Sequence, residues 1–279
     1  MKAIIGSAAL AAGTLTRGQL RARYDRVLTD VYLPKKGDRT VTDYAEAAWL
    51  WSGGSGIVTG ATAAALHGVR WIEPSAPIEL ITARRSLDPR LITRKVRHHA
   101  DEVVTSTSGM LVATPARTAL DIARHMSLED AVQHLDALAA ATDVSRIEIA
   151  TLARRYRRAA NISQSRYALR LMDGGSGSRY ESSLRLAMIN AGFPRPATAI
   201  RVSEGMTTVV VALGWEQQRI GLSCAVVEGP SGPIWHQLTR DNFLQLQGWI
   251  NLHVSPRLSL RSTVYRVSEA FRVQRRRGL

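Results

Sequence analysis

The chain has 279 residues, 45% of them hydrophobic, so it can bury a full core and form either two domains or one large one. Its single cysteine, Cys224, excludes an internal disulfide framework and a zinc site built from cysteines, so we expect a cytoplasmic protein. The formal net charge of +14 makes a polyanion the first partner to consider.

The excess positive charge lies almost entirely in the second half of the chain. Residues 151–279 contain 19 arginines, no lysine and 7 acids, which accounts for +12 of the +14. A concentrated positive field binds polyanions in a salt-dependent way, so we expect nucleic acid, duplex DNA in particular. A membrane surface is disfavoured as the partner. The arginine-rich C-terminal end of the chain has only Tyr265 and Phe271 as large aromatic residues nearby, too few for the apolar face that membrane binding requires. A solvated arginine-rich surface remains the alternative interpretation.

The first 42 residues predict two short helices and a strand pair. The apolar run 3–12 is too short to span a bilayer and weak as a signal peptide, so it is interpreted as part of a domain, with a helix at Ala8–Ala12. Thr16 is the expected N-cap of a second, basic helix over Arg17–Arg26. Residues 27–34 then favour extended structure.

Two pieces of this segment carry a family resemblance. Thr16-Arg17-Gly18-Gln19-Leu20-Arg21, followed by Asp30-Val31-Tyr32-Leu33-Pro34, resembles the shortened winged-helix start of AbiEi-like proteins, where a basic helix precedes a "GVY" strand. Asp30 replaces the usual glycine of that strand. The resemblance implies that Arg17 and Arg21 contact DNA. A small capping segment that reads no bases is the alternative, because a helix-turn-helix normally needs a full second helix to enter the major groove.

Residues 43–173 predict an α/β body followed by helices. Gly60-Ala61-Thr62-Ala63-Ala64-Ala65-Leu66-His67-Gly68 and the segment from Thr114 to Arg124 resemble two motifs of the AbiEi antitoxin body, which implies a structural and regulatory role without catalysis. Arg117 and Asp121, at i and i+4, are predicted to pair on a helix surface or at an interface. His67 is expected to cap the helix or to lie in the core with its ring nitrogens hydrogen-bonded. No acidic residue stands at a spacing that would indicate a catalytic partner for it.

A different module is expected beyond the linker-like run Gly174-Gly175-Ser176-Gly177-Ser178. Residues 178–279 predict a helix, a three-strand meander, a helix, a strand and a last helix. This order, with Glu181-Ser182-Ser183-Leu184-Arg185, Leu213-Gly214-Trp215 and Gly248-Trp249, resembles the Vsr-like endonuclease domain of the restriction-endonuclease-like (PD-(D/E)xK) superfamily. The expected fold class of the whole chain is therefore α+β, with an α/β domain of this type at its end.

The resemblance implies a Mg²⁺ site whose acids this chain has lost. The family's aspartate before "GW" is Ala212 here, and two further acids align with Ser223 and Ala225. Alanine and serine cannot supply the hard anionic ligand that Mg²⁺ requires. We therefore expect a degenerate domain with no catalytic residue, no metal and no cofactor. If the domain were active, Glu181 would bind Mg²⁺ together with the relocated acids Glu228 and Asp241.

Arginines of the N-terminal segment and of residues 178–279 are the candidates for contacts with DNA phosphates. They are Arg17, Arg21, Arg179, Arg185, Arg219, Arg240, Arg257 and Arg261. The expected function is a DNA-binding protein of regulatory or defence-related type, similar to antitoxins and transcriptional regulators, with an inactive nuclease-fold domain. Two alternatives stay open: an active Mg²⁺-dependent DNA endonuclease that uses Glu181, and an antitoxin that sequesters a toxin protein.

Overall fold

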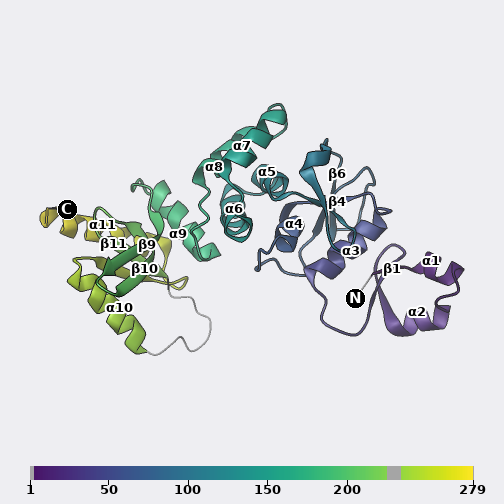
Figure 1. Cartoon of the computed structure of the whole chain (residues 1–279), viewed down its shortest axis with the longest axis horizontal. Coiled ribbons are helices and arrows are strands. Elements are labelled where there is room, and N and C mark those ends of the chain that lie inside the picture. Colours follow the sequence, from purple (N-terminus) through teal and green to yellow (C-terminus); the bar gives the residue numbers. More distant parts are fainter. Residues whose placement is uncertain (1–2, 225–233, 279) are drawn as a thin grey trace. The chain divides into compact units, whose positions relative to one another are not determined.

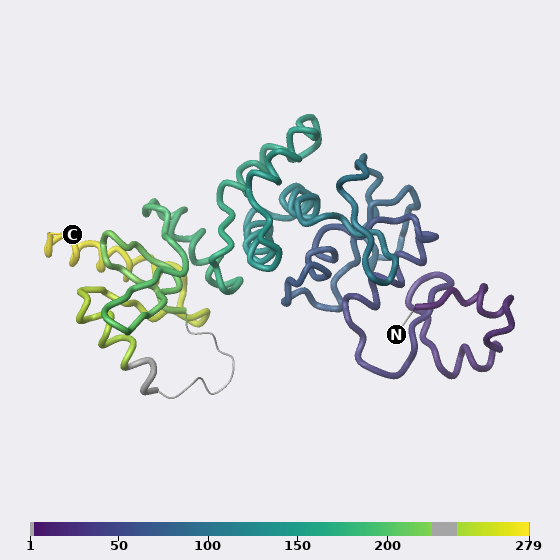
Figure 2. Tube along the Cα trace, in the orientation of Figure 1, coloured from purple at the N-terminus to yellow at the C-terminus, as the bar shows by residue number. Residues whose placement is uncertain are grey.

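The chain forms two compact units, Met1–Arg170 and Leu171–Leu279, in a computed structural model that describes residues 3–224 and 234–278. The chain passes from the first unit to the second once (Figure 2). Both units combine helices with a sheet, so the α+β class expected from the sequence is confirmed. In the two described ranges, every helix is too short or too polar to cross a bilayer.

The first unit begins with two short helices and a three-stranded antiparallel sheet of order β1-β3-β2 (Figure 1). These elements are β1 (Ile4–Ile5), α1 (Gly6–Ala11), α2 (Arg17–Arg23), β2 (Tyr24–Leu28) and β3 (Val31–Pro34). Thr16 caps α2 as expected, in a capping box with Gln19. Helix α2 ends three residues earlier than the sequence predicted, because Tyr24 already begins β2.

A two-residue turn joins β2 to β3, where Leu28 is paired with Val31. Asp30 in this turn has a left-handed backbone with φ of 60°. Its carboxylate accepts hydrogen bonds from the Ser7 amide at 2.9 Å and from the Ser7 hydroxyl, in the first turn of α1. An aspartate tolerates this backbone and also satisfies an N–H of the helix end, which explains why it stands where AbiEi-like sequences have glycine.

The body of the first unit is a mixed five-stranded sheet of order β6-β5-β4-β8-β7, in which β5–β6 and β4–β8 are parallel pairs. Its strands are β4 (Ile57–Val58), β5 (Ile78–Ile81), β6 (Leu91–Arg94), β7 (Val103–Thr105) and β8 (Leu111–Ala113). The helices are α3 (Val41–Trp51), α4 (Gly60–Leu66), α5 (Pro115–His125), α6 (Leu128–Thr142), α7 (Arg146–Arg155) and α8 (Ile162–Leu171), with a 3-10 turn at Ala100–Glu102.

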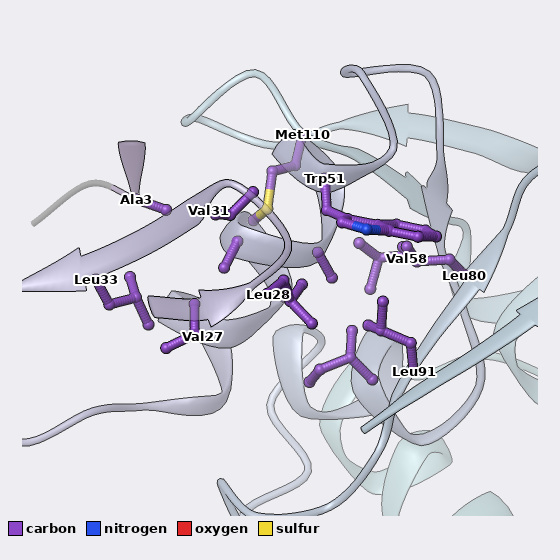
Figure 3. Packing of buried hydrophobic residues seen from close by; sticks show 14 of the residues in the cluster. Ala3, Val27, Leu28, Val31, Leu33, Trp51, Val58, Leu80, Leu91 and Met110 are labelled. Carbon is purple, nitrogen blue, oxygen red and sulfur yellow. The ribbon is translucent and has the colours of Figure 1, made fainter. Parts of the chain in front are cut away.

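One hydrophobic core joins the N-terminal sheet to this body. Val27, Val31 and Leu33 are buried in the same cluster as Trp51 and Leu80 (Figure 3). Burial of this apolar surface is the main favourable term that fixes the small sheet in place. Residues 1–42, which the sequence suggested as a separate segment, therefore share their core with the rest of the first unit.

The second unit is built on a four-stranded sheet of order β12-β11-β10-β9, with β9 to β11 antiparallel and β12 parallel to β11. Its elements are α9 (Arg179–Asn190), β9 (Ala197–Glu204), β10 (Thr207–Trp215), β11 (Ile220–Cys224), α10 (Ile234–Leu246), β12 (Ile250–Val254) and α11 (Leu260–Arg276). Leu184 of α9 and Val267 of α11 pack with Leu222. Leu244 of α10 packs with Val211 in a separate cluster. Helices α9 and α11 therefore cover one face of the sheet and α10 the other.

The glycine-rich run expected as a linker is packed on the second unit. Leu171 O accepts a hydrogen bond from Arg185 Nη1 at 2.6 Å, and Asp173 Oδ1 accepts one from the Thr198 hydroxyl at 2.8 Å. A Cβ added to Gly175 would lie 2.2 Å from the Thr198 hydroxyl oxygen, so the chain approaches β9 too closely for a side chain. The unit boundary accordingly lies before this run, within α8.

Candidate functional site

Helix α2 is the basic helix that the sequence predicted near the N-terminus, and its cations are exposed. Arg17, Arg21 and Arg23 are all exposed, while Leu20 of the same helix is buried. Lys35 Nζ donates to Arg21 O at 2.6 Å, which adds a fourth cation at the C-terminal end of the helix. Among the described residues none of these four side chains is in an ion pair, so their charges face solvent. We call Arg17, Arg21, Arg23 and Lys35 the α2 basic face.

The first antitoxin-like motif forms the start of α4, where its glycine is sterically required. Gly60 has a φ of +57°, and a Cβ added there would lie 2.3 Å from the Glu79 carboxylate. That carboxylate accepts a hydrogen bond from the Ala61 amide at 2.8 Å and forms an ion pair with Arg94 Nη1 at 2.5 Å. The Glu79 side chain thereby satisfies an N–H of the helix end, and only glycine leaves room for it.

The second motif builds a buried ionic network around Arg117 of α5. Arg117 Nε donates to Asp121 at 2.9 Å, and Nη1 donates to Glu102 at 2.5 Å. Tyr156 lies against the guanidinium, with its hydroxyl donating to Glu102 at 2.6 Å, while Thr59 donates to Asp121 at 2.7 Å. Burial and the hydrogen bond to Glu102 raise the pKa of Tyr156. The predicted Arg117–Asp121 pair is present, but it is an internal pair and not a surface or interface one, because both side chains are at most 2% exposed.

His67 closes α4 as its C-cap residue. Its Nε2 donates to Ala113 O at 2.8 Å, at the end of β8. The imidazole therefore ties α4 to the neighbouring strand. This confirms the structural role that the sequence predicted for the residue.

Glu181 acts at the N-terminus of α9. Ser178 is the N-cap, and its hydroxyl accepts a hydrogen bond from the Glu181 amide at 3.2 Å. The Glu181 carboxylate accepts from the Gly177 amide at 2.7 Å, one residue further back than a capping box requires. With 8% of its surface exposed, this carboxylate serves the backbone turn that precedes the helix.

Cys224, at the end of β11, lies close to this turn. Burial, with a contribution from the Glu181 charge, raises the pKa of Cys224 to about 12. Burial also raises the pKa of the neighbouring Tyr180. Both groups are therefore neutral at physiological pH, and neither is activated as a nucleophile.

Asp241, one of the relocated acids, lies in α10 and serves a polar cluster with β12. Its carboxylate accepts from Asn251 Nδ2 at 2.8 Å and from His253 Nε2 at 2.7 Å. The Ser223 hydroxyl in turn donates to Asn251 Oδ1 at 3.0 Å. These side chains belong to the sheet face that α10 covers, whereas Glu181 lies in α9 on the other face.

The residues described do not fit a Mg²⁺ ion. Two or three carboxylate oxygens would have to converge on it. Ala212 and Ser223 offer no carboxylate, and the sheet separates Asp241 from Glu181. Within residues 3–224 and 234–278, no group of three His, Cys, Asp or Glu side chains is arranged to hold a metal. Glu228, the other relocated acid, lies outside the described residues.

The six candidate arginines of the second unit do not form one surface. Arg185 is fully buried and donates to Leu171 O, so it is unavailable to DNA and its prediction as a phosphate contact is wrong. Arg219 precedes β11, while Arg257 follows β12, so these two lie at opposite ends of the parallel strand pair. Arg240 is half-buried and donates to Val210 O at 2.6 Å. Of the candidates in both units, those exposed to solvent are Arg17, Arg21, Arg179, Arg219, Arg257 and Arg261.

Sequence reasoning missed three residues that complete these sites. Lys35 joins the α2 basic face, and its only signal was the Lys35-Lys36 pair that follows β3. Glu102 and Tyr156 complete the Arg117 network from positions 15 before and 39 after that arginine. No local periodicity links residues so far apart, so Glu102 and Tyr156 had no sequence signal as partners of Arg117.

Comparison with known proteins places the two motifs in one domain. Residues 56–171 match the model of the AbiEi antitoxin C-terminal domain. Two uncharacterized Mycobacterium tuberculosis proteins, Rv2248 of strain H37Rv and MT2308 of strain CDC 1551, are each 29% identical over 208 residues, which cover 72% of this chain and 74% of theirs. The crystal structure of the RV2827C protein from the same species matches with a TM-score of 0.40 and 14% identity, over 73% of this chain and 84% of that one. Over residues 56–171 the chain is therefore similar to AbiEi antitoxin C-terminal domains, which supports an antitoxin or regulatory role.

Proposed function

We propose that the protein is an antitoxin-type regulator that binds duplex DNA through the α2 basic face. The observation that carries this is the exposure of Arg17, Arg21 and Arg23 on one short helix, with Lys35 at its end. Phosphate contacts by such cations supply the salt-dependent part of DNA binding. The seven residues of α2 extend about 10 Å, close to the width of the major groove, so few bases are within its reach.

We also propose that the second unit contributes charge without cleaving DNA or requiring a cofactor. The positions that align with metal-binding acids are Ala212 and Ser223, and the Glu181 carboxylate is engaged by the Gly177 amide. The exposed Arg257 and Arg261 follow β12 and add positive charge at that end of the sheet. Such a surface strengthens binding to any duplex and leaves sequence preference to the first unit.

The test is fluorescence anisotropy of a labelled duplex with the full chain across a salt series. Replacement of Arg17 and Arg21 by alanine removes two phosphate contacts, so the slope of log K against log salt should fall by roughly two. The matched control replaces Arg157 and Arg158, two exposed arginines after α7, by alanine. That variant loses the same charge and should keep the wild-type slope.

Two results would overturn the DNA proposal. The wild-type protein would show no binding at low salt, or the control variant would lose as much of the slope as the α2 variant. The first result would favour the protein-sequestering antitoxin, whose partner is a toxin protein. The second would mean that the net charge of the chain, and not α2, binds the duplex.

The endonuclease alternative is tested on the same samples with Mg²⁺ added. We expect the duplex to stay intact over hours. Nicking that requires Mg²⁺ and disappears in Glu181→Ala would instead establish an active nuclease. The N-cap variant Ser178→Ala controls for loss of the α9 N-terminus, because it weakens the same helix end and retains the Glu181 carboxylate.

A further inference from the structure

An open groove runs between α7 and α8, with a volume of about 580 Å³. Its floor is apolar and consists of Ala150, Ala153 and Leu169, with the side chain of Ile147 at one edge. Ile147 is 79% exposed, whereas Ile149, two residues further along α7, is completely buried. Two alanines in the floor leave space into which larger apolar side chains of another molecule can insert. We call this the α7–α8 groove.

Four arginines form the rim of this groove. Arg146 and Arg154 flank it on α7, and Arg166 and Arg170 flank it on α8. Among the described residues that line the groove, none is acidic. Glu148, the acid of α7, is engaged at the N-cap, where its carboxylate accepts from the Ser145 amide at 2.7 Å and from the Ser145 hydroxyl at 2.6 Å. The lining therefore combines the positive charge of arginines on both helices with an apolar floor.

We propose that the α7–α8 groove binds an acidic amphipathic helix of a partner protein. An apolar stripe on such a helix would fill the floor, and carboxylates on both sides of the stripe would meet the arginine rim. The groove follows α7 from Arg146 to Arg154, a length of about 12 Å. This length matches anchor residues at i, i+4 and i+7 of a docked helix, which span about 10 Å.

Charge and shape argue against other occupants. Nucleic acid would place its phosphates on the rim, but it would leave the apolar floor without a complementary surface. A second copy of the chain, docked symmetrically, would bring arginines of one rim against arginines of the other. A membrane requires a projecting apolar face, whereas this floor is recessed and Ile147 is its only large exposed apolar residue. The proposal does not depend on DNA binding by α2, which involves other residues.

The probe is a fluorescein-labelled helical peptide of about 18 residues, with leucines at i, i+4 and i+7 and glutamates on both flanks. Binding to the full chain is measured by anisotropy, and we expect micromolar affinity. A peptide with serines in place of the leucines, and one with lysines in place of the glutamates, should each bind at least about tenfold more weakly.

Variants of the chain locate the binding site. Ala150→Glu places a carboxylate on the exposed part of the floor, and Arg154→Glu with Arg166→Glu reverses two rim charges. Each change should lower the affinity for the acidic peptide by about tenfold or more. The control Arg157→Glu with Arg158→Glu makes the same charge change outside the groove and should alter the affinity less than about twofold.

Three results would overturn this proposal. The acidic peptide would fail to bind at low salt, the serine peptide would bind as well as the leucine peptide, or the control variant would lose as much affinity as the rim variant. The last two results would show attraction to net charge without use of the groove. Because Ala150 is exposed, the Ala150→Glu variant should fold like the wild type. Circular dichroism checks this, so that a loss of binding is not mistaken for a loss of the fold.

Discussion

Arg117 Nε donates a hydrogen bond to Asp121 Oδ2 at 2.9 Å, and both side chains are almost completely withdrawn from water, at 1% and 2% exposed. A buried pair of charges is stable only if its other hydrogen-bonding atoms are also satisfied. Glu102, Tyr156 and Thr59 provide several of these contacts from other parts of the first unit, whereas Arg117 Nη2 and Asp121 Oδ1 are buried without a hydrogen-bond partner among the described residues. The network therefore joins the 3-10 turn, α5 and the segment after α7 into one arrangement.

Removing one member of this network should destabilise the first unit strongly. Arg117→Met removes the cation that Glu102 and Asp121 share and leaves them only the longer contacts with Arg155 at 3.3 Å and Arg124 at 3.9 Å. We therefore expect a loss of about 3 kcal/mol in the free energy of unfolding. Hydrogen exchange of α5 amides under native conditions measures this loss in the first unit alone.

The control for Arg117 is Arg90, whose side chain is 58% exposed and whose Nη2 lies 2.6 Å from the partly exposed Asp88 carboxylate. Arg90→Ala should cost at most about 1 kcal/mol, because water screens the exposed charges. If both variants lowered the exchange protection equally, burial would not be the source of the Arg117 effect.

Arg185 should matter for stability and not for DNA binding. Its guanidinium is fully buried and holds Leu171 O at 2.6 Å, which fixes the run before α9. Arg185→Met should cost about 3 kcal/mol, because a buried carbonyl loses a charged donor and other contacts of the guanidinium are lost with it. Exchange of α9 amides measures the cost. At a temperature where the variant stays folded, its salt slope for duplex DNA should equal that of the wild type, and a reduced slope would contradict the burial of this side chain.

Cys224 should be a slowly reacting thiol in the folded protein. Its pKa is raised to about 12 by burial and by Glu181, so almost no thiolate is present at pH 8. Ellman's reagent should modify it slowly in buffer and rapidly in urea. Because the chain has one cysteine, the whole signal comes from this site. Fast reaction in the native protein would show that the end of β11 is open to solvent.

The same shift makes stability dependent on pH. The folded state holds the thiol proton more tightly than the unfolded state does, since the pKa rises from 9 to about 12. The contribution of Cys224 to stability is therefore complete below about pH 9 and is lost as the pH rises toward 12. Between pH 8 and pH 10.5, Tm should fall further for the wild type than for Cys224→Ala. An equal fall in both proteins would assign the alkaline loss to other groups.

The Asp30 turn predicts an order among three substitutions. Asp30→Asn keeps an acceptor for the Ser7 amide and a residue that tolerates a φ of 60°, so stability should change little. Asp30→Gly loses the hydrogen-bond acceptor, but glycine also adopts a φ of 60°, so the free energy of unfolding should fall by at most about 1 kcal/mol. Asp30→Ala loses both and should cost about 2 kcal/mol. Thermal unfolding ranks the three proteins, and a glycine variant less stable than the alanine variant would contradict the role of the left-handed backbone.

Most of the helices could be predicted from local signals. Thr16 caps the helix that the sequence assigned to it, and Thr114 and Ser178 cap α5 and α9, because capping depends on residues within one turn. Strands β6, β7 and β8 were not predicted, since each has only three or four residues and lacks a clear alternation. The position of β1 depends on its pairing with β3, which is 27 residues away and gives no local signal.

The sites were less predictable than the fold. Arg17 and Arg21 are exposed although Leu20, at i+3 from Arg17, is buried, so the periodicity of this short helix does not by itself predict their exposure. Burial of Arg185 depends on the return of the chain at Leu171, and separation of Asp241 from Glu181 depends on which sheet face each helix covers. Both are tertiary relationships, so residue type alone favoured the wrong role for Arg185.

The two units are contiguous in sequence, and this order has a consequence for synthesis on the ribosome. The antitoxin-like domain and its buried network lie within the first 171 residues. At ordinary translation speeds the following stretch to Leu279 takes roughly 5–20 s to synthesise, which is long compared with the folding of a domain of this size. The first unit is therefore expected to fold while the arginine-rich second unit is still emerging, so a nascent chain displays the α7–α8 groove before the second unit exists.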